Sequence, residues 1–370
     1  MSTCFDIRSS TADYSVSIEA GLFESMLREK SQDVLIADSW FSAQLAAANR
    51  EAILIPANET SKSLDSIPEL IISLRKLGAN RHTRLISLGG GVVQDVVAFV
   101  ASVFMRGINW IYFPTTLLAM ADSCIGGKSS INVGPYKNIV GTFHPPQAVL
   151  IDPSLALTLN DERRIGGLVE AVKICYCRGE ESFEEYMALD PQKAMDIEKV
   201  EQIVKCSLRA KKWFIEVDEF DRAERLLLNF GHTFGHAIEG ASHFRIEHGI
   251  GVGIGILCAL ELGRLIGRNY ATATRPSMLE DYLRPLLLAV PGLGPKISEL
   301  PIAEVLDRFQ ADKKHGIDFY SVILIAECGK VELFRFLKDK SSTSLIETAI
   351  LNTMDSFVSP NSKSMKTNEI

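Results

Sequence analysis

The amino-acid sequence predicts an α/β protein in two parts: an N-terminal part built on a mostly parallel sheet, and a C-terminal part that is mainly α-helical. In the first part, short apolar runs alternate with segments of helical periodicity, which is typical of a parallel sheet covered by helices. The runs lie at residues 34–37, 53–55, 85–88, 110–113 and 149–151. After Asp152 the spacing is helical over long segments, at residues 162–177, 197–217 and 226–241.

The boundary between the two parts is expected near Ile151. The last predicted strand is followed there by Pro153 and by a capped helix start at Asn160-Asp161-Glu162. The predicted domains are residues 1–151, residues 152–340 and a tail of residues 341–370. The tail is rich in Ser, Thr and Asn; its apolar stretch at 345–351 could dock as a helix, and we expect its last ten residues to be disordered.

Composition and charge narrow the class of protein. The 370 residues include 39 basic and 46 acidic side chains, so a formal charge of −7 leaves no general basic surface for nucleic acid or an anionic membrane. The seven cysteines are odd in number and lack a CxxC pair, which fits a reducing compartment. The first ten residues lack an apolar signal segment, and no run of 18 apolar residues occurs. We therefore expect a cytoplasmic protein with neither nucleic acid nor membrane as a partner.

A glycine turn joins one predicted strand to a helix. Gly89-Gly90-Gly91 follows the strand at 85–88 and opens a helical segment at 92–104, an order that presents backbone N–H groups to a phosphate. The fingerprint GxGxxG would require glycine where Gln94 stands, so the match is partial. Asp95 could either stabilise the helix dipole or bind a nucleotide hydroxyl group.

A second glycine loop lies at residues 122–138. Gly126-Gly127-Lys128-Ser129 is similar to the end of a P-loop, but that motif needs a glycine where Asp122 stands, which argues against an ATPase or kinase. The remaining interpretation is a loop that places Lys128 and Asn138 where they could hold an anion. The alternative is that these side chains are simply solvated.

Three histidines lie within seventeen residues of the second part. His232 and His236 are four residues apart and share a helix face, and His248 follows them. A catalytic zinc ion takes three protein ligands, often including a carboxylate, and Glu170 is a candidate. Spacing alone pairs His232 with His236 as ligands. The alternative is a set of core histidines bonded to the backbone.

Several charged residues could be functional or could form ordinary surface pairs. Lys173 lies three residues after Glu170, so a helix would carry both on one side. Lys211 and Arg225 flank an acidic pair, and Asp312-Lys313-Lys314 is a charge run that is usually a solvated face.

Taken together, these segments resemble the dehydroquinate synthase family, part of the sugar phosphate cyclase superfamily, over most of residues 30–335. The resemblance rests on several independent motifs in order. They are Gly89-Gly90-Gly91-Val92 with Asp95, Arg106-Gly107, Pro114-Thr115-Thr116-Leu117-Leu118, Asp122-Ser123 with Gly126-Gly127-Lys128, Lys137-Asn138, Glu170 with Lys173, Asn229 with Gly231-His232-Thr233-Phe234-Gly235-His236, and His248-Gly249.

The resemblance implies a Rossmann-like nucleotide-binding α/β domain and a helical metal-binding domain, with NAD and zinc (or cobalt) in a cleft between them, usually in a homodimer. It assigns the metal to Glu170, His232 and His248 and leaves His236 beside it, in contrast to the pairing from spacing. The implied NAD contacts are Asp38, Glu59, Lys62, Gly89, Gly90, Gly91, Asp95, Thr115, Thr116 and Lys137. The implied substrate contacts are Asp122, Lys128, Asn138, Lys173, Lys211, Arg225, Asn229 and His236, with Arg106 from the neighbouring subunit and one lysine of the 312–314 run, of which we favour Lys313.

The implied reaction is a phosphate-eliminating ring closure. NAD takes a hydride from a phosphorylated keto-sugar acid, phosphate leaves, NADH returns the hydride, and ring opening with aldol closure gives the carbocycle. The expected substrate is 3-deoxy-D-arabino-heptulosonate 7-phosphate and the product 3-dehydroquinate, as in aromatic amino-acid biosynthesis by the shikimate pathway.

Three departures from the family pattern leave the substrate open: Gln94 in place of glycine, Ser129-Ser130 in place of Thr-Gly, and Ile250 in place of glutamate. They could mark a cyclase that acts on an amino analogue or on sedoheptulose 7-phosphate, although Gly126-Gly127-Lys128 argues against the branch that makes 2-epi-5-epi-valiolone or 2-deoxy-scyllo-inosose. The sequence is also compatible with a metal-dependent alcohol dehydrogenase of the related polyol family and with a nonenzymatic nucleotide-binding relative.

Overall fold

The computed structural model describes residues 3–29, 31–134, 136–193, 195–271 and 273–358. Their contacts divide the chain into two compact units. The first, here called the α/β unit, comprises Met1–Leu159 and Glu185–Asp221, and the second, the helical unit, comprises Asn160–Glu184 and Arg222–Ile370. This division differs from the single boundary expected near Ile151, since the chain returns to the first unit before it completes the second.

The returning segment is held in the α/β unit by helix α7 (Ile197–Val217). One face of α7 is buried and packs on the π-helix η5 (Ala119–Ser123) and on the 3-10 helix η6 (Pro153–Thr158). Helix α6 (Glu180–Ala188) begins in the helical unit and ends in the α/β unit. Helical spacing in the sequence predicted α7 but could not show which unit it joins, because that depends on its distant packing partners.

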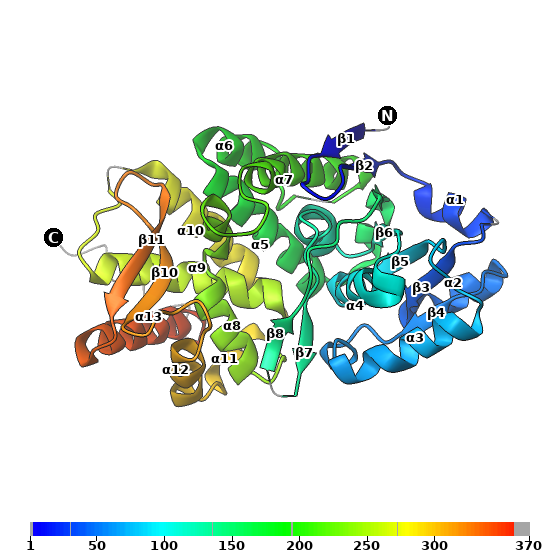
Figure 1. The fold of residues 1–370 in the computed structure, drawn as a ribbon. Helices are drawn as coiled ribbons and strands as arrows, with labels where there is room; N and C mark the ends of the chain where they lie inside the picture. The colour runs from blue at the N-terminus through cyan, green and yellow to red at the C-terminus, as the bar shows by residue number, and fades with distance from the viewer. Residues whose placement is uncertain (1–2, 30, 135, 194, 272, 359–370) are drawn as a thin grey trace. The chain divides into compact units, whose positions relative to one another are not determined.

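The α/β unit contains a seven-stranded sheet in the order β1-β2-β9-β6-β5-β3-β4 (Figure 1). The five predicted strands are present, and β2, β9, β6, β5, β3 and β4 pair in parallel. The antiparallel pair of β1 and β2 was not predicted. The bounds are β1 (Thr3–Ile7), β2 (Tyr14–Ile18), β3 (Val34–Asp38), β4 (Ile53–Ile55), β5 (Leu85–Gly89), β6 (Trp110–Pro114) and β9 (Ala148–Ile151).

Helix α4 (Gly91–Val103) covers the centre of this sheet. It packs on β5 and β6, and its apolar side chains are almost all buried, which matches the continuous apolar character of the sequence there. The other elements of the unit are α1 (Leu22–Arg28), η1 (Ser39–Phe41), α2 (Ser42–Ala47), η2 (Glu59–Ser61), η3 (Leu64–Ser66), α3 (Ile67–Lys76), η4 (Phe104–Arg106) and the hairpin of β7 (Ile131–Val133) and β8 (Tyr136–Val140).

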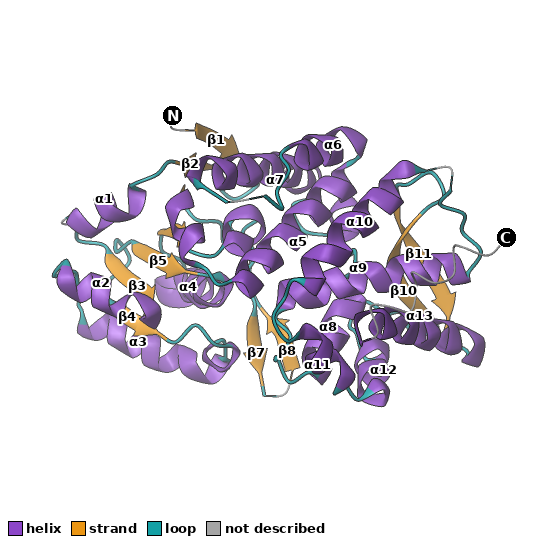
Figure 2. Ribbon diagram, turned by 180° about the vertical axis from the view of Figure 1, so that it is seen from behind, coloured by secondary structure: helices purple, strands orange, loops and turns teal. Residues whose placement is uncertain are grey.

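Helix α9 (His248–Leu265) is the central helix of the helical unit (Figure 2). It packs against α5, α8, α10, α13 and β10. It is long and apolar enough to cross a membrane by composition, but 78% of that window is buried within the protein, as in a core helix. The other elements are α5 (Asp161–Arg178), η7 (Glu224–Asn229), α8 (His232–Ala241), α10 (Thr274–Leu288), α11 (Leu293–Ser298), α12 (Ile302–Gln310), β10 (Phe319–Ile325), β11 (Val331–Leu337) and α13 (Lys340–Val358).

The structure changes one sequence-based expectation for this unit and agrees with another. The helix predicted at residues 226–241 is broken, because Gly231 adopts a left-handed backbone (φ 79°) between the 3-10 turn η7 and helix α8. In the tail, the apolar stretch lies within α13, where Ile346, Ile350 and Met354 are buried. The last ten residues, which we expected to be disordered, lie outside the described residues.

Candidate functional site

Glycines on helices α8 and α9 let their backbones approach closely. A Cβ atom on Gly235 would lie 2.9 Å from the carbonyl carbon of Gly251, and a Cβ atom on Gly255 would lie 2.0 Å from the carbonyl oxygen of Gly231. No larger residue fits at these positions without moving a backbone. The close crossing fixes α8, which carries His232 and His236, against α9, which begins at His248.

The three histidines converge as a result. One ring nitrogen from each of His232, His236 and His248 lies within 4.8 Å of the others, and no other such group of His, Cys, Asp or Glu is found in the described part of the chain. Their ring centroids are 5.3–5.4 Å apart. The pair expected from spacing and the third histidine implied by the resemblance therefore belong to one cluster.

Glu170 on α5 faces this cluster. Its Oε1 atom is 3.4 Å from His248 Nε2 and 3.8 Å from His232 Nε2. The side chain is fully buried, and Oε1 has no hydrogen-bond partner among the described residues. A buried carboxylate oxygen without a donor is costly, and two imidazoles beside it complete a donor set that suits zinc or cobalt. These residues therefore fit a divalent metal ion.

The other oxygen of Glu170 forms an ion pair with Lys173, one turn along the same helix. Both side chains are at most 2% exposed. The sequence left open a plain surface pair at this spacing, and burial excludes that alternative. Lys173 balances the carboxylate charge and is held at the edge of the histidine cluster.

Burial and nearby charges shift the pKa values of the three rings in different directions. Burial, together with the charge of Lys173, lowers the pKa of His232 well below its ordinary value. Burial and Lys314 lower that of His236 to about 3. Burial also disfavours a charged His248, but the carboxylates of Glu170 and Glu239 outweigh it and raise its pKa to about 10. His232 and His236 are thus neutral at pH 7, whereas His248 would have to release a proton before it could bind a metal ion.

Glu239 was not singled out from the sequence. Its Oε2 atom lies 3.1 Å from Nδ1 of His248, so it can hold the ring with Nε2 directed at Glu170. The signal was available, because Glu239 follows His232 by seven residues on α8 and so shares its helix face.

The remaining candidates of the helical unit lie on η7 and on the loop after α12. Arg225 is buried, and Asn229 donates to the backbone carbonyl of Leu226 (3.0 Å). In the charge run, Lys314 pairs with Asp312 at 2.8 Å and lowers the pKa values of His232 and His236. The sequence favoured Lys313, and the structure makes Lys314 an equally strong candidate.

In the α/β unit, the glycine turn forms as expected between β5 and α4. A Cβ atom on Gly90 would lie 3.0 Å from Cγ2 of Thr116, and the Thr115 N–H donates to the carbonyl of Gly89 at 3.1 Å. Both threonines therefore adjoin the turn. The first N–H groups of α4 lie at the carboxyl end of a parallel strand, where open α/β sheets bind nucleotides.

A polar cluster at Glu59, Lys62, Asp95 and Lys137 belongs to the same unit. Lys62 contacts Asp95 at 2.6 Å, and Lys137 contacts Glu59 at 3.4 Å. Burial raises the pKa of Asp95 to about 6, although Lys62 acts in the opposite direction. These four residues are all implied NAD contacts, and they form two ion pairs. Asp38 caps the turn after β3, where it accepts from the Trp40 N–H.

The candidate substrate residues of this unit form two lysine–aspartate pairs. Lys211 Nζ lies 2.5 Å from the carboxylate of Asp122 and donates to its backbone carbonyl at 2.6 Å. Lys128 Nζ lies 2.6 Å from Asp221, which was not anticipated from the sequence. Asn138 has a left-handed backbone (φ 54°), and its N–H donates to a side chain in β7.

Arg106 is exposed in the 3-10 turn η4, with φ 69°. The residue before it, Met105, is also left-handed (φ 50°), so the chain accepts strain at two neighbouring positions. This conformation leaves the guanidinium group at the surface of the unit.

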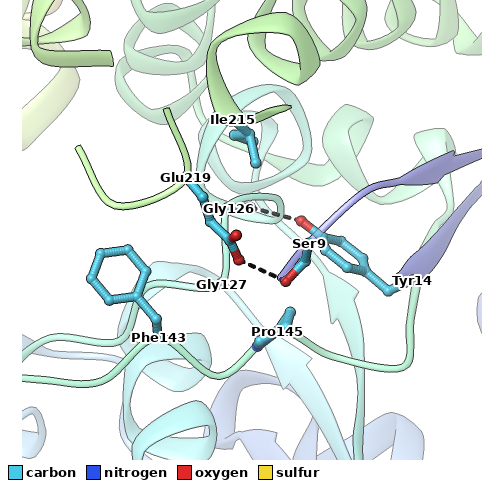
Figure 3. Close-up of a pocket in the computed structure, with 8 residues that line it drawn as sticks. All are labelled: Ser9, Tyr14, Gly126, Gly127, Phe143, Pro145, Ile215 and Glu219. Atoms are coloured by element: carbon cyan, nitrogen blue, oxygen red, sulfur yellow. Dashed lines mark hydrogen bonds between the residues drawn. The ribbon is translucent and has the colours of Figure 1, made fainter. Parts of the chain in front are cut away.

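The loop at Gly126-Gly127-Lys128 is hydrogen-bonded to strand β2 near the start of the chain (Figure 3). The Gly126 N–H donates to the Tyr14 hydroxyl group at 2.8 Å, and the Ser9 hydroxyl group donates to Glu219 at 2.6 Å. Figure 3 shows these residues around Gly127, Phe143 and Pro145. Strand β2 therefore supports the backbone just before Lys128.

The fold and these two groups of residues are typical of enzymes that combine a nucleotide-binding α/β unit with a metal-binding helical unit. The family profile described as 3-dehydroquinate synthase N-terminal matches residues 52–165, and the profile described as 3-dehydroquinate synthase C-terminal matches residues 167–315. A 3-dehydroquinate synthase of Dictyoglomus turgidum is 36% identical over 311 residues, covering 83% of this chain and 85% of the relative. The chain belongs to the 3-dehydroquinate synthase family.

Two solved structures have a similar fold. 2-Deoxy-scyllo-inosose synthase, complexed with carbaglucose-6-phosphate, NAD+ and Co2+, has a TM-score of 0.81 at 23% identity and covers 95% of this chain and 99% of that one. 2-Epi-5-epi-valiolone synthase from Streptomyces hygroscopicus subsp. jinggangensis 5008, with NAD+ and Zn2+, has a TM-score of 0.75 at 23% identity and covers 94% and 98%. At this identity the likeness extends to the fold alone.

Proposed function

We propose that this chain is an NAD- and metal-dependent carbon–oxygen lyase that converts 3-deoxy-D-arabino-heptulosonate 7-phosphate to 3-dehydroquinate. Its family membership supports the reaction class. The observation that carries the site is the buried Oε1 atom of Glu170, without a donor and 3.4 Å and 3.8 Å from two imidazole nitrogens. A metal ion there would polarise a substrate hydroxyl group, and bound NAD would take and return the hydride.

The residues of the helical unit hold that chemistry in place. Glu170, His232 and His248 would be the ligands, and His236 remains beside them as a ring that is neutral at pH 7. Its neutrality follows from burial and from the nearby Lys314 charge. Lys173 pairs with one oxygen of Glu170, and the other oxygen lies beside His248 and His232.

The residues of the α/β unit bind the cofactor and the anionic groups of the substrate. The N–H groups of the Gly89–Gly91 turn and the adjoining threonines would hold the NAD pyrophosphate, with the Lys62–Asp95 and Lys137–Glu59 pairs as further contacts. Lys128, Lys211 and Asn138 would bind carboxylate and phosphate through charge-assisted hydrogen bonds. We also propose a cytoplasmic homodimer in which Arg106 reaches the neighbouring site.

Phosphate release from 3-deoxy-D-arabino-heptulosonate 7-phosphate tests this function. The purified protein is supplied with NAD and zinc while absorbance at 340 nm is followed. Stoichiometric phosphate with no lasting NADH signal is expected, because the hydride returns within each turnover. Lasting NADH from a polyol would instead indicate an alcohol dehydrogenase, and phosphate from sedoheptulose 7-phosphate alone would change the substrate.

A variant separates the substrate role from the fold. Lys128→Ala should abolish phosphate release while NAD still binds, because the ammonium group is proposed to contact substrate and not NAD. The control is Lys76→Ala on the exposed face of α3, which should leave the rate unchanged. Full activity of Lys128→Ala would remove this assignment.

A further inference from the structure

Gln94 occupies the position where the glycine fingerprint would have its last glycine, and its side chain is nearly fully buried. A buried amide needs partners, and both partners of this one belong to Ser123. The Gln94 Nε2 atom donates to the Ser123 carbonyl at 2.7 Å, and its Oε1 atom accepts from the Ser123 hydroxyl group at 2.5 Å. One side chain thus connects the first turn of α4 to a segment 29 residues away.

Ser123 is the last residue of the π-helix η5, which also carries Asp122. A π-helical turn is an uncommon conformation that is found often at functional sites, because it re-aims the side chains it contains. The carbonyl groups at its end lack continuing helical partners. Gln94 satisfies one of these carbonyls and so fixes where the π-helix stops.

Helix α7 holds the same segment from another side. Ser207 donates to the Ala121 carbonyl at 2.8 Å, and Lys211 holds both the carboxylate and the carbonyl of Asp122. Asp122 thus lies between two fixed supports, one from α7 and one from Gln94. A short residue at position 94 would remove the support from Gln94 and keep the support from α7.

We propose that Gln94 is a positioning residue that ties the glycine turn to η5 and thereby fixes the Asp122–Lys211 pair before substrate binds. The inference rests on the proposed function, because Lys211 is assigned there to substrate and Asp122 is its ion-pair partner. It also explains why this chain can dispense with the fingerprint glycine. The Gln94 amide links the Gly89–Gly91 turn, which is assigned to NAD, to η5, which carries Asp122.

Two variants test the link. Gln94→Met keeps the length of the side chain and loses both hydrogen bonds, and Ser123→Ala loses only the hydroxyl bond. Gln94→Met should lower kcat at least tenfold, since small displacements of a positioned group have large effects on rate. The KM for the sugar phosphate and the Kd for NAD should stay within about twofold. The control is Gln310→Met on the exposed end of α12.

The double variant separates positioning from general destabilisation. If both changes act through one contact, Gln94→Met with Ser123→Ala should be no slower than Gln94→Met alone. Amide hydrogen exchange of residues 119–124 should accelerate about tenfold in Gln94→Met. Unchanged kcat, with only a lower melting temperature, would overturn the proposal.

Hydrogen exchange also separates this inference from the proposed function. If the wild-type chain releases no phosphate, the proposed function fails, but the exchange of residues 119–124 still reports on the link. Unchanged exchange in the Gln94→Met variant would then refute the positioning role by itself.

Discussion

Replacing Lys173 with methionine should destabilise the metal-free protein and have much less effect once zinc is bound. The change keeps the length of the side chain but removes the positive partner of the fully buried Glu170. Breaking a buried ion pair by removing one partner costs about 3–5 kcal/mol. His248 Nε2 lies 3.4 Å from the other carboxylate oxygen and keeps a polar neighbour beside it, so we expect a loss near the lower limit, about 3 kcal/mol.

Zinc changes this result because a metal ion beside Oε1 would supply the positive charge that Lys173 no longer provides. The loss should then approach the roughly 1 kcal/mol of one hydrogen bond. For a unit of this size, about 2–4 °C corresponds to 1 kcal/mol, so the melting temperature should fall by about 6–12 °C without metal and by about 2–4 °C with zinc.

Scanning calorimetry of chelator-treated protein, with and without zinc, measures both values. The matched control is Arg164→Met, which breaks a pair at the same i, i+3 spacing on the same helix, but at the surface. That change should cost less than about 1 kcal/mol in both conditions. An equal loss for Lys173→Met with and without zinc would show that the free oxygen of Glu170 does not face the metal.

Three further changes probe the two groups of residues. Glu239→Ala should weaken zinc binding about 10–100-fold in a chelator competition, because the carboxylate orients His248; unchanged affinity would leave Glu239 no such role. Asp221→Asn should lower the KM for the sugar phosphate by up to about fivefold, since it frees Lys128 from a partly exposed pair; a higher KM would contradict this. The raised pKa of Asp95 means that the folded state favours its protonated form, so wild-type stability relative to Asp95→Asn should fall as pH rises from about 4 through 6, by about 3 kcal/mol. Denaturant unfolding across that range tests the sign, and a rise in relative stability would refute it.

The sheet was predictable because its central strands are encoded locally. Each buried parallel strand reads as a short continuous apolar run, so residues 34–37 and 85–88 identify β3 and β5 without reference to the rest of the chain. The hairpin of β1 and β2 was missed since its strands are short and partly exposed. Its position depends on pairing between Val16 in β2 and Val149 in β9, far along the chain.

The site was predictable in its residue types but not in its connections. Histidine spacing located α8, and the resemblance added Glu170 and His248, yet neither could show that Gly235 brings the helices together. Glu239, Asp221 and the link from Gln94 were missed for one reason. Each acts through a partner on another element, and spacing along one helix or loop does not encode such a contact.

The four candidate ligand-binding lysines of the α/β unit all have a carboxylate partner. The pairs are Lys62 with Asp95, Lys137 with Glu59, Lys128 with Asp221, and Lys211 with Asp122. This arrangement lets a chain of net charge −7 keep cationic groups partly buried, since an unpaired buried ammonium group would tend to lose its proton. It also means that an anionic ligand must compete with an existing carboxylate for each lysine. A ligand with one charge gains little from such an exchange, whereas a sugar acid with both a carboxylate and a phosphate can engage two lysines at once, so the paired lysines favour doubly charged substrates.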